Sequence, residues 1–470
     1  MDISASSEYF SVNVGEAQLV PPATPTPQEF KSLSKVDAQV CIRHHIPFVH
    51  FYPPSRSSSS RDPVEVIKMA LSRALVHYYP LAGRLRNEGM DGKLVVDCCG
   101  EGVIFREAIA DITLEELRRI NGDLRPPFPR WERLLVDDVW GSNFITDSPL
   151  LRMQVTRLSC GGFVLAYTLN HYMCDGYGTL QFITAVSEFS QDPIRKNPSV
   201  LPSWTRDALS SRSPSTRSML THCQELNIVA NDPDGAHHIL TKTSFKRFDE
   251  TSFFFSNADI ATLKKQAACI ENHGTIFDAV VSCLWRARTR ASLISSSLEE
   301  EDVTKLFSVV DTRFRYKHDD LSKGFYGNTL VVSCATAKAS MLIDKPLSYA
   351  ASLTTQAKKR AVEQVRKASC FDFLEMDTNR IYLQKGAFMV SNTRWFKFVE
   401  VDFGWGRAAY AGPARAGIGL LPGVAASLQW HKNNEGVEGL LALVSLPHMS
   451  ATRFHEEVRK EVLGGFMSTL

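Results

Sequence analysis

The sequence predicts an α/β protein, because strand-like and helix-like segments alternate in both halves of the chain. In the first half, a helical pattern starts near residue 62, and the apolar run 163–169 has the length of a buried strand. The second half shows a helical pattern over 276–288, followed by strand patterns over 306–310 and 330–332. We therefore expect mixed sheets flanked by helices.

The first expected helix has clear start and stop signals. Asp62 suits the N-cap, Pro63 suits the first turn, and Glu65 lies where a capping box needs an acidic residue. Pro80 ends the helical pattern, because proline disrupts a helix interior. One apolar face repeats at helical spacing along this segment: Ile67, Ala70, Leu71, Ala74, Leu75 and Tyr78.

Further elements of the first half follow from the same patterns. Residues 93–97 and 103–105 are expected to be short strands on either side of a glycine-containing turn. The buried strand over 163–169 leads into a second helix, which we expect to begin at about Thr179. Its apolar side chains recur at helical spacing: Phe182, Ile183, Val186 and Phe189.

The organisation of the chain is predicted from a break in this periodicity near its middle. Residues 210–217 have the serine-rich composition of a linker. We therefore expect two domains of similar size, residues 1–195 and 236–470, joined by a crossover linker at 196–235. No repeat of solenoid period is present in the sequence.

Composition excludes several classes of protein. The 470 residues carry 53 Lys and Arg against 51 Asp and Glu, so the net charge of +2 does not favour nucleic acid as a partner. No apolar run is long enough to span a membrane. The N-terminus lacks the pattern of a secretory signal. We expect a monomer in the cytoplasm, with a peroxisomal location as an alternative on a weak signal at residues 468–470.

Cysteine usage agrees with an intracellular location. The chain has 10 cysteines and no C-x-x-C motif. Cys98 and Cys99 are adjacent and therefore badly placed for a shared metal ion or a relaxed disulfide. We expect reduced thiols throughout, and no metal site.

Common catalytic motifs are missing from the sequence. It contains no G-x-S-x-G, G-x-x-x-x-G-K-[ST], G-x-G-x-x-G or H-E-x-x-H pattern. The missing motifs exclude most members of four classes: α/β-hydrolases, P-loop enzymes, typical dinucleotide-binding proteins and H-E-x-x-H zinc proteases.

A histidine directly after a buried strand is the first candidate catalytic group. His171 follows the strand expected at 163–169, and Asp175 lies in a turn with Gly176 and Gly178. Ligands bind at such strand ends, and an imidazole titrates near neutral pH, so His171 can act as a general base. A buried Asp175 would need a cation and would hold the loop that aims the imidazole. A core histidine bonded to a carbonyl group is the alternative, and the two glycines disfavour a metal-binding helix here.

The second candidate motif is Asp402-Phe403-Gly404-Trp405-Gly406. Two glycines around a tryptophan predict a tight bend with the aromatic ring packed into it. Taken alone, the motif indicates a structural turn.

Together, H-x-x-x-D-G at 171–176 and D-F-G-W-G at 402–406 resemble the motif pair of the plant BAHD acyltransferases. The resemblance extends over nearly the whole chain. It implies two chloramphenicol-acetyltransferase-like domains with a channel between them. The other segments that carry it are Tyr79–Leu85, Gly100–Val103, Leu284–Arg290 and Gly324–Asn328.

Finer features resemble one branch of this family, the benzyl alcohol O-benzoyltransferases and alcohol acyltransferases. These features are Phe30–Ser34, Ile46–Val49, Tyr410–Gly417 and Leu421–Ala425. Acceptor specificity changes readily on one fold, so the branch is a softer indication than the motif pair.

The resemblance implies a reaction and a catalytic base. An acyl-CoA and an alcohol would enter the channel from opposite faces. The expected acyl-CoA is benzoyl-CoA or another aromatic acyl donor, and the expected alcohol is one such as benzyl alcohol. His171 would take the proton of the hydroxyl as it attacks the thioester. The acyl group would pass directly to the alcohol with no acyl-enzyme, which fits the absence of a triad-type nucleophile. Acyl-CoA would be a co-substrate, and no permanently bound cofactor is implied.

The resemblance also implies roles for residues around the base. Asp175 would pair with Arg313, and Gly176 and Asn328 would shape the channel. Asp402 is discussed in the family as a second base, and we expect it to be structural. Gly404 and Trp405 of the same motif are expected to help shape the active site.

Two departures from the family pattern concern the oxyanion and the CoA site. Many relatives carry a tryptophan where this chain has Thr393, and Trp395 is displaced, so the oxyanion donor stays open. Residues 319–323 replace a proline-rich loop. Thr275, which opens an expected helix, and Ser391 are the candidates for CoA contacts.

Other functions remain open at this point. An amine acceptor would make the protein an N-acyltransferase by the same chemistry. A peptide-synthetase condensation domain usually has two adjacent histidines, whereas here Asn170 precedes His171. A non-catalytic descendant would bind acyl-CoA or a metabolite without releasing CoA.

Overall fold

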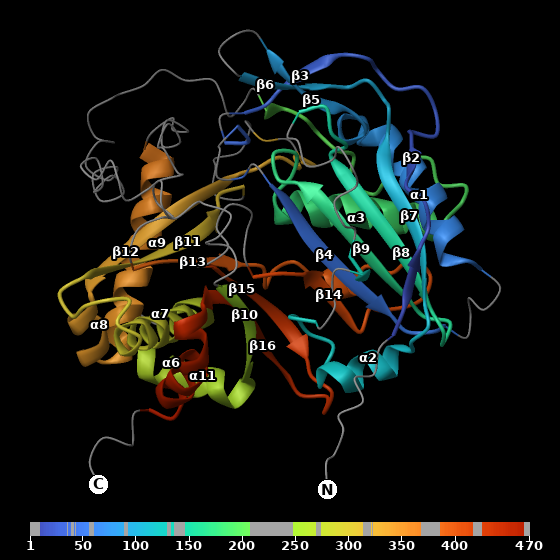
Figure 1. Cartoon of the computed structure of the whole chain (residues 1–470). Helices are drawn as coiled ribbons and strands as arrows, with labels where there is room; N and C mark the ends of the chain where they lie inside the picture. The colour runs from blue at the N-terminus through green and yellow to red at the C-terminus, as the bar shows by residue number, and fades with distance from the viewer. Residues whose placement is uncertain are drawn as a thin grey trace, which may run out of the picture.

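The computed structural model describes residues 10–34, 36–38, 42, 44–55, 61–88, 93–128, 133–135, 146–206, 248–268, 274–313, 321, 323–367, 386–416 and 425–464. These residues form mixed sheets flanked by helices, as Figure 1 shows, so the predicted α/β class is confirmed. Over this part of the chain, no helix combines the length and the apolar character needed to cross a membrane.

The first large sheet is built mostly from the N-terminal half. Its strand order is β1-β7-β8-β9-β4-β14, with β2 also paired to β7. Only β7 and β8 run parallel. The strands are β1 (Val12–Val14), β2 (Gln18–Val20), β4 (His45–Tyr52), β7 (Val103–Ala110), β8 (Leu151–Leu158), β9 (Phe163–Asn170) and β14 (Tyr410–Pro413).

Helices α1 (Pro63–His77) and α3 (Gly176–Gln191) pack against each other beside this sheet. The apolar face predicted for the first helix is buried, and all eight residues of β9 are buried as well. The capping box expected with Glu65 does not form in α1. The Asp62 carboxylate instead accepts a hydrogen bond from the Val64 N–H at 3.2 Å and pairs with Arg157 at 2.6 Å.

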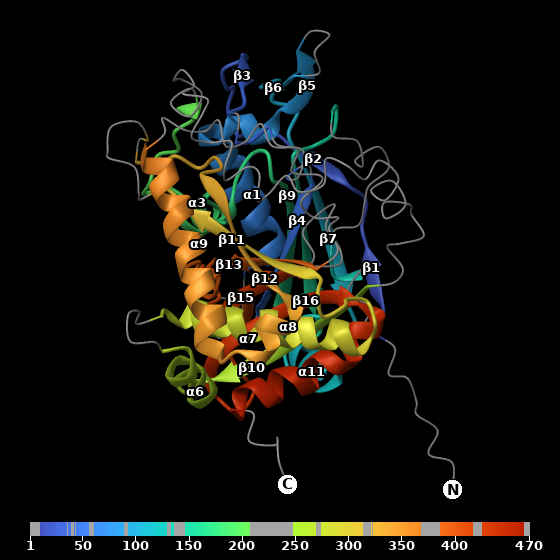
Figure 2. The same cartoon turned by 90° about the vertical axis from the view of Figure 1, so that its left-hand side faces the viewer.

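A second large sheet belongs to the C-terminal half, with the order β10-β16-β15-β13-β11-β12. Figure 2 shows α9 lying along β11 and β12. The strands are β10 (Phe248–Ser256), β11 (Val303–Asp311), β12 (Leu330–Lys338), β13 (Ala387–Asn392), β15 (Ala425–Lys432) and β16 (Glu438–Pro447). The helices are α6 (Asn257–Ala267), α7 (Ile276–Ile294), α8 (Ala339–Asp344), α9 (Leu347–Lys367) and α11 (His448–Val462).

Smaller elements complete the described chain. A three-stranded sheet has the order β3-β6-β5, formed by β3 (Phe30–Ser32), β5 (Arg84–Glu88) and β6 (Lys93–Asp97). The short helices are α2 (Leu114–Asn121) and the 3₁₀ turns η2 (Tyr79–Ala82) and η7 (Phe398–Glu400).

The chain crosses back to the first sheet late in its course. Strand β14 pairs antiparallel with β4, so that Tyr410 lies opposite Phe51 and Pro413 opposite Phe48. The C-terminal half therefore supplies an edge strand to the N-terminal sheet. Of the expected linker at 196–235, residues 196–206 are described, and 207–235 lie outside the described residues.

Candidate active site

His171 lies directly after β9, at the edge of a cavity that holds about 90 Å³ of free space. Its backbone is held on both sides: its N–H donates to the carbonyl of His44 at 2.9 Å, and its carbonyl accepts from Asn328 Nδ2 at 2.7 Å. Burial lowers the pKa of the imidazole, and the nearby carboxylate of Asp175 partly opposes this shift. The ring is therefore neutral near pH 7, as a general base must be.

Both large sheets contribute to this cavity. On one side lie the start of β4 and the end of β14, and on the other lie β11, β12, β13 and β15. Ser391 and Gly176 line it, whereas Asp175, Arg313, Asn328, Thr275, Asp402, Gly404 and Trp405 do not. The lining residues are His44, His45, Ile46, Pro47, Phe48, His171, Gly176, Val309, Asp311, Leu330, Ser391, Asn392, Thr393, Phe396, Pro413, Arg415 and Ser427.

The expected ion pair between Asp175 and Arg313 is present. Asp175 is the N-cap of α3, and its Oδ1 accepts from the Gly178 N–H at 2.9 Å. Its Oδ2 accepts from the Arg313 guanidinium at 2.8 Å. Burial raises the pKa of Asp175, and the charge of Arg313 opposes that rise. Both carboxylate oxygens are thus engaged in holding the turn that carries His171.

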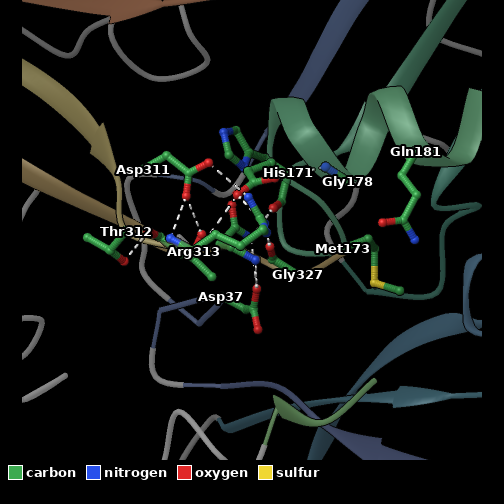
Figure 3. A network of polar contacts seen from close by, with 12 residues as sticks. Asp37, His171, Met173, Gly178, Gln181, Asp311, Thr312, Arg313 and Gly327 are labelled. Atoms are coloured by element: carbon green, nitrogen blue, oxygen red, sulfur yellow. Dashed lines mark hydrogen bonds and ion pairs between the residues drawn. The ribbon is translucent and has the colours of Figure 1, made fainter. Parts of the chain in front are cut away.

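Arg313 is itself held by several groups, as Figure 3 shows. Its guanidinium donates to Asp311 at 3.0 Å and to the carbonyl of Gly327 at 2.7 Å, and it lies 4.4 Å from the ring centre of Tyr177. Its side chain is only 7% exposed. Such multiple pairing is what a buried guanidinium requires.

Helix α3 starts at Gly176, three residues earlier than the predicted start at Thr179. The predicted start was wrong because glycine usually disfavours a helix. Here the first turn of the helix needs glycine, since tertiary contacts leave no room for a side chain. A Cβ atom on Gly178 would lie 1.9 Å from the carbonyl oxygen of Tyr326, and one on Gly176 would lie 2.4 Å from the ring of Phe396. The glycines therefore let the first turn of the helix pass close to two neighbouring segments.

The second motif forms a compact turn near the start of β9, at the end opposite His171. Asp402 Oδ1 accepts from the N–H groups of Gly404 at 2.7 Å and Gly406 at 2.8 Å. These glycines have φ values of 100° and 86°, which favour glycine. Trp405 is buried against Phe163, with ring centres 5.3 Å apart. The geometry is that of a stable turn packed on the first sheet.

The residues considered for contacts with CoA and with the oxyanion differ in their hydrogen bonds and exposure. The Thr275 hydroxyl caps α7, donating to Asp278 Oδ2 at 2.8 Å. The Thr393 hydroxyl donates to the carbonyl of Leu428 at 2.8 Å. Trp395 is 75% exposed. Burial raises the pKa of the Cys174 thiol, which keeps it in its unreactive form.

Two buried charged residues near the site were not predicted from the sequence. Asp37 is fully buried and accepts from the backbone N–H and the side chain of Asn328. Arg206, 1% exposed, pairs with Asp37. The only local signal is the spacing of Ser34 and Asp37, a capping-type pattern with no apolar helix after it. Within the described chain, no group of three or more potential metal ligands is close enough to hold a metal ion.

Comparison with known proteins finds relatives over nearly the whole chain. The family described as "Transferase family" matches residues 10–460. Benzyl alcohol O-benzoyltransferase of Petunia hybrida is 39% identical over 468 residues, covering 99% of this chain and 96% of the relative. (Z)-3-hexen-1-ol acetyltransferase of Arabidopsis thaliana is 38% identical over 451 residues, covering 96% of this chain and 94% of the relative.

Among solved structures, vinorine synthase is similar to the chain. The TM-score is 0.67 at 19% sequence identity, and the match covers 94% of this chain and 96% of that one. At that identity the likeness concerns the fold, and it confirms the architecture expected from the motif pair.

Proposed function

The chain belongs to the Transferase family, as a BAHD acyltransferase, and on that premise we propose that it moves a benzoyl or another aromatic acyl group from coenzyme A to an alcohol such as benzyl alcohol. The observation that carries the proposal is the position of His171. A neutral, largely buried imidazole lines a cavity to which both sheets contribute. An alcohol and a thioester that reach the cavity from opposite sides would meet at this ring.

The proposed reaction has two steps, addition of the alcohol to the thioester and expulsion of the CoA thiolate. Nδ1 of His171 is a buried atom, so we assign Nε2 as the nitrogen that takes the hydroxyl proton. The alcohol oxygen bonds to the thioester carbonyl carbon and forms a tetrahedral oxyanion. The oxyanion collapses, the carbon–sulfur bond breaks, and the imidazolium returns its proton to the CoA thiolate. We propose that the acyl group passes directly to the alcohol, since Cys174, the thiol within the His171 motif, is buried and unactivated.

Other residues act by positioning. Asp175 and Arg313 hold the turn that presents His171, and Asn328 holds its carbonyl. Gly176 shapes the cavity wall. We propose a structural role for Asp402, with Gly404 and Trp405, because its carboxylate closes a turn outside the cavity.

Ser391 and Thr275 are the residues proposed to contact CoA. Ser391 lines the cavity, which suits a contact with the pantetheine arm. Thr275 has its hydroxyl engaged in the cap of α7, so a contact there would come from the helix N-terminus rather than from the hydroxyl. The Thr393 hydroxyl is also engaged, and the oxyanion donor must therefore be sought among other cavity groups.

The first test is release of free thiol from benzoyl-CoA in the presence of benzyl alcohol, with the ester identified by mass. His171→Ala should lower kcat by about 10²-fold or more, because the base is lost. His455→Ala is the matched control, since this half-buried histidine on α11 does not line the cavity, and it should keep activity. Turnover that survives in His171→Ala would contradict the assigned base.

The acceptor and donor are tested by a panel. If benzoyl-CoA and benzyl alcohol give no ester, acetyl-CoA with other alcohols and with amines is tested next, and an amide product would assign an N-acyltransferase. Binding of acyl-CoA without CoA release for every pair would favour a non-catalytic binder. A broad set of accepted alcohols would replace the specific benzyl alcohol assignment.

We further propose that the enzyme works as a cytoplasmic monomer. The described cysteines support a reducing compartment, because Cys98, Cys99, Cys160, Cys174, Cys283 and Cys334 are free thiols. Light scattering in solution tests the oligomeric state, and a fluorescent fusion with and without residues 468–470 tests the peroxisomal alternative.

A further inference from the structure

The catalytic turn is held by a second buried ion pair besides Asp175 and Arg313. Asp37, in the loop after β3, is fully buried, and Arg206, at the start of the expected linker, is 1% exposed. Their side chains form an ion pair. Burying such an ion pair costs free energy of folding unless its remaining polar atoms form hydrogen bonds. The groups that form those hydrogen bonds therefore indicate what the pair stabilises.

The partners of Arg206 are backbone carbonyls of the catalytic turn. Its guanidinium donates to the carbonyl of Tyr172 at 3.2 Å and to that of Met173 at 2.6 Å. The guanidinium carbon of Arg206 also lies 3.9 Å from the ring centre of Trp204, in a cation–π contact. The planar fork of arginine suits such simultaneous contacts. Arg206 thus fixes the two residues that directly follow His171.

The partners of Asp37 determine how Asn328 is oriented. Asp37 Oδ1 accepts from the Asn328 backbone N–H at 3.0 Å and from its Nδ2 at 2.8 Å. The same Nδ2 donates to the carbonyl of His171 at 2.7 Å. Both partners of this side-chain amide atom are hydrogen-bond acceptors, so the atom is the nitrogen Nδ2. The other amide atom of Asn328 is therefore the oxygen Oδ1, which accepts hydrogen bonds.

Within the described residues, two buried atoms here have no well-formed hydrogen bond: Oδ1 of Asn328 and Nδ1 of His171. Burial lowers the pKa of His171, whereas its own backbone and the side chain of Asn328 lie close enough to raise it. A buried ring nitrogen and a buried carbonyl oxygen each need a partner. An Nδ1–H donor on His171 would satisfy both atoms, and it leaves the lone pair on Nε2, which the reaction requires. Figure 3 places Asp37 and His171 in one network of polar contacts.

We propose that Asp37, with Arg206, is a positioning residue that sets the tautomer of His171 through the orientation of Asn328. The proposal rests on the assignment of His171 as the general base. Asp37 does not line the cavity and touches no substrate, so its effect is on the base alone. Its negative charge also raises the pKa of His171, against the larger effect of burial.

The test variant is Asp37→Asn, which keeps the size and removes the charge. We expect kcat to fall about tenfold or more while KM for both substrates stays within about twofold, because binding groups are unchanged. The acid limb of kcat/KM should move to lower pH, since a carboxylate that favours the imidazolium is lost. The other titratable or charged side chains around His171 are unchanged in this variant: His44, His45 at the start of β4, Asp311, Arg415 and the Asp175–Arg313 pair.

A buried ion pair away from the cavity is the matched control. Arg286 on α7 pairs with Glu461 on α11 at 3.0 Å, and both side chains are buried. Glu461→Gln should lower stability without moving the acid limb or kcat. An equal shift of the limb in Glu461→Gln, or none in folded Asp37→Asn, would overturn the proposal.

Nitrogen NMR of the imidazole measures the tautomer directly and needs no substrate. With the His171 signal identified from His171→Ala, the native protein should show the Nδ1–H form and Asp37→Asn a mixture. This readout is independent of whether the proposed donor and acceptor are correct. If Asp37→Asn does not fold, Asn328→Ala, which keeps the Asp37–Arg206 pair, should show the same mixture. An unchanged Nδ1–H tautomer in either folded variant refutes the proposal.

Discussion

The guanidinium of Arg313 donates a hydrogen bond to Asp175 at 2.8 Å, although the two residues are 138 positions apart in the chain. The other carboxylate oxygen accepts from the Gly178 N–H, and within the described residues no hydrogen bond joins Asp175 to the imidazole of His171. Asp175 is thus linked to His171, the proposed base, through the backbone of the turn rather than through a side-chain relay.

This pairing predicts the behaviour of Arg313→Ala. The variant leaves a buried carboxylate without its cation, which we expect to cost about 3–5 kcal/mol of unfolding free energy and most of the activity. Chemical denaturation and CoA release measure the two effects. Lys338→Ala, which breaks an exposed pair with Glu301, should cost at most about 1 kcal/mol and leave turnover intact. Full activity in folded Arg313→Ala would show that the pairing is dispensable.

The pH dependence of the reaction follows from the burial of His171. Burial lowers its pKa below the ordinary value of 6.5, and a general base is active only in its neutral form. Activity should therefore persist as the pH falls below 6.5 and be lost at the lowered pKa. The acid limb of kcat/KM measures this, with circular dichroism at each pH as the control for folding. A limb at or above 6.5 would contradict the environment described for the ring.

The role of Asp402 is distinguished by two substitutions. Asp402→Asn keeps an oxygen to accept from Gly404 and Gly406, so it should retain kcat within about threefold. Asp402→Ala removes both hydrogen bonds and should lower the melting temperature. Thermal unfolding and turnover of both variants provide the comparison. A second catalytic base at this position would instead lose activity in Asp402→Asn, because an amide cannot take a proton.

The Thr393 hydroxyl offers a test of the oxyanion donor. Removing a donor of this kind typically costs about 10²–10³ in kcat. The hydrogen of Thr393 already bonds to Leu428, so Thr393→Val should lower kcat less than about tenfold. Steady-state kinetics at saturating substrate measures it, with Ser333→Ala on β12, outside the cavity, as a control for loss of a buried hydroxyl. A loss of 10²-fold in Thr393→Val alone would assign Thr393 as the donor.

Secondary structure was most predictable where a signal was local and repeated. The apolar face of α1 and the mostly apolar strand β9 follow from the sequence pattern, since such residues have to be buried whatever they pack against. The start of α3 was missed because Gly176 and Gly178 are helix-disfavouring by themselves. Their neighbours Phe396 and Tyr326, distant in sequence, leave no room for a Cβ atom.

The α/β class, the motif pair and the family could be predicted from the order of residue types along the chain. Three features required the folded structure: which side chains line the cavity, the pairing of β14 with the first sheet, and the contact of the Asp37–Arg206 pair with the turn after His171. A buried charge is stable only beside its partner, and the partner comes from elsewhere in the chain. A local sequence pattern does not show which distant residue pairs with a buried charge. The network around His171 could therefore be identified only in the folded chain.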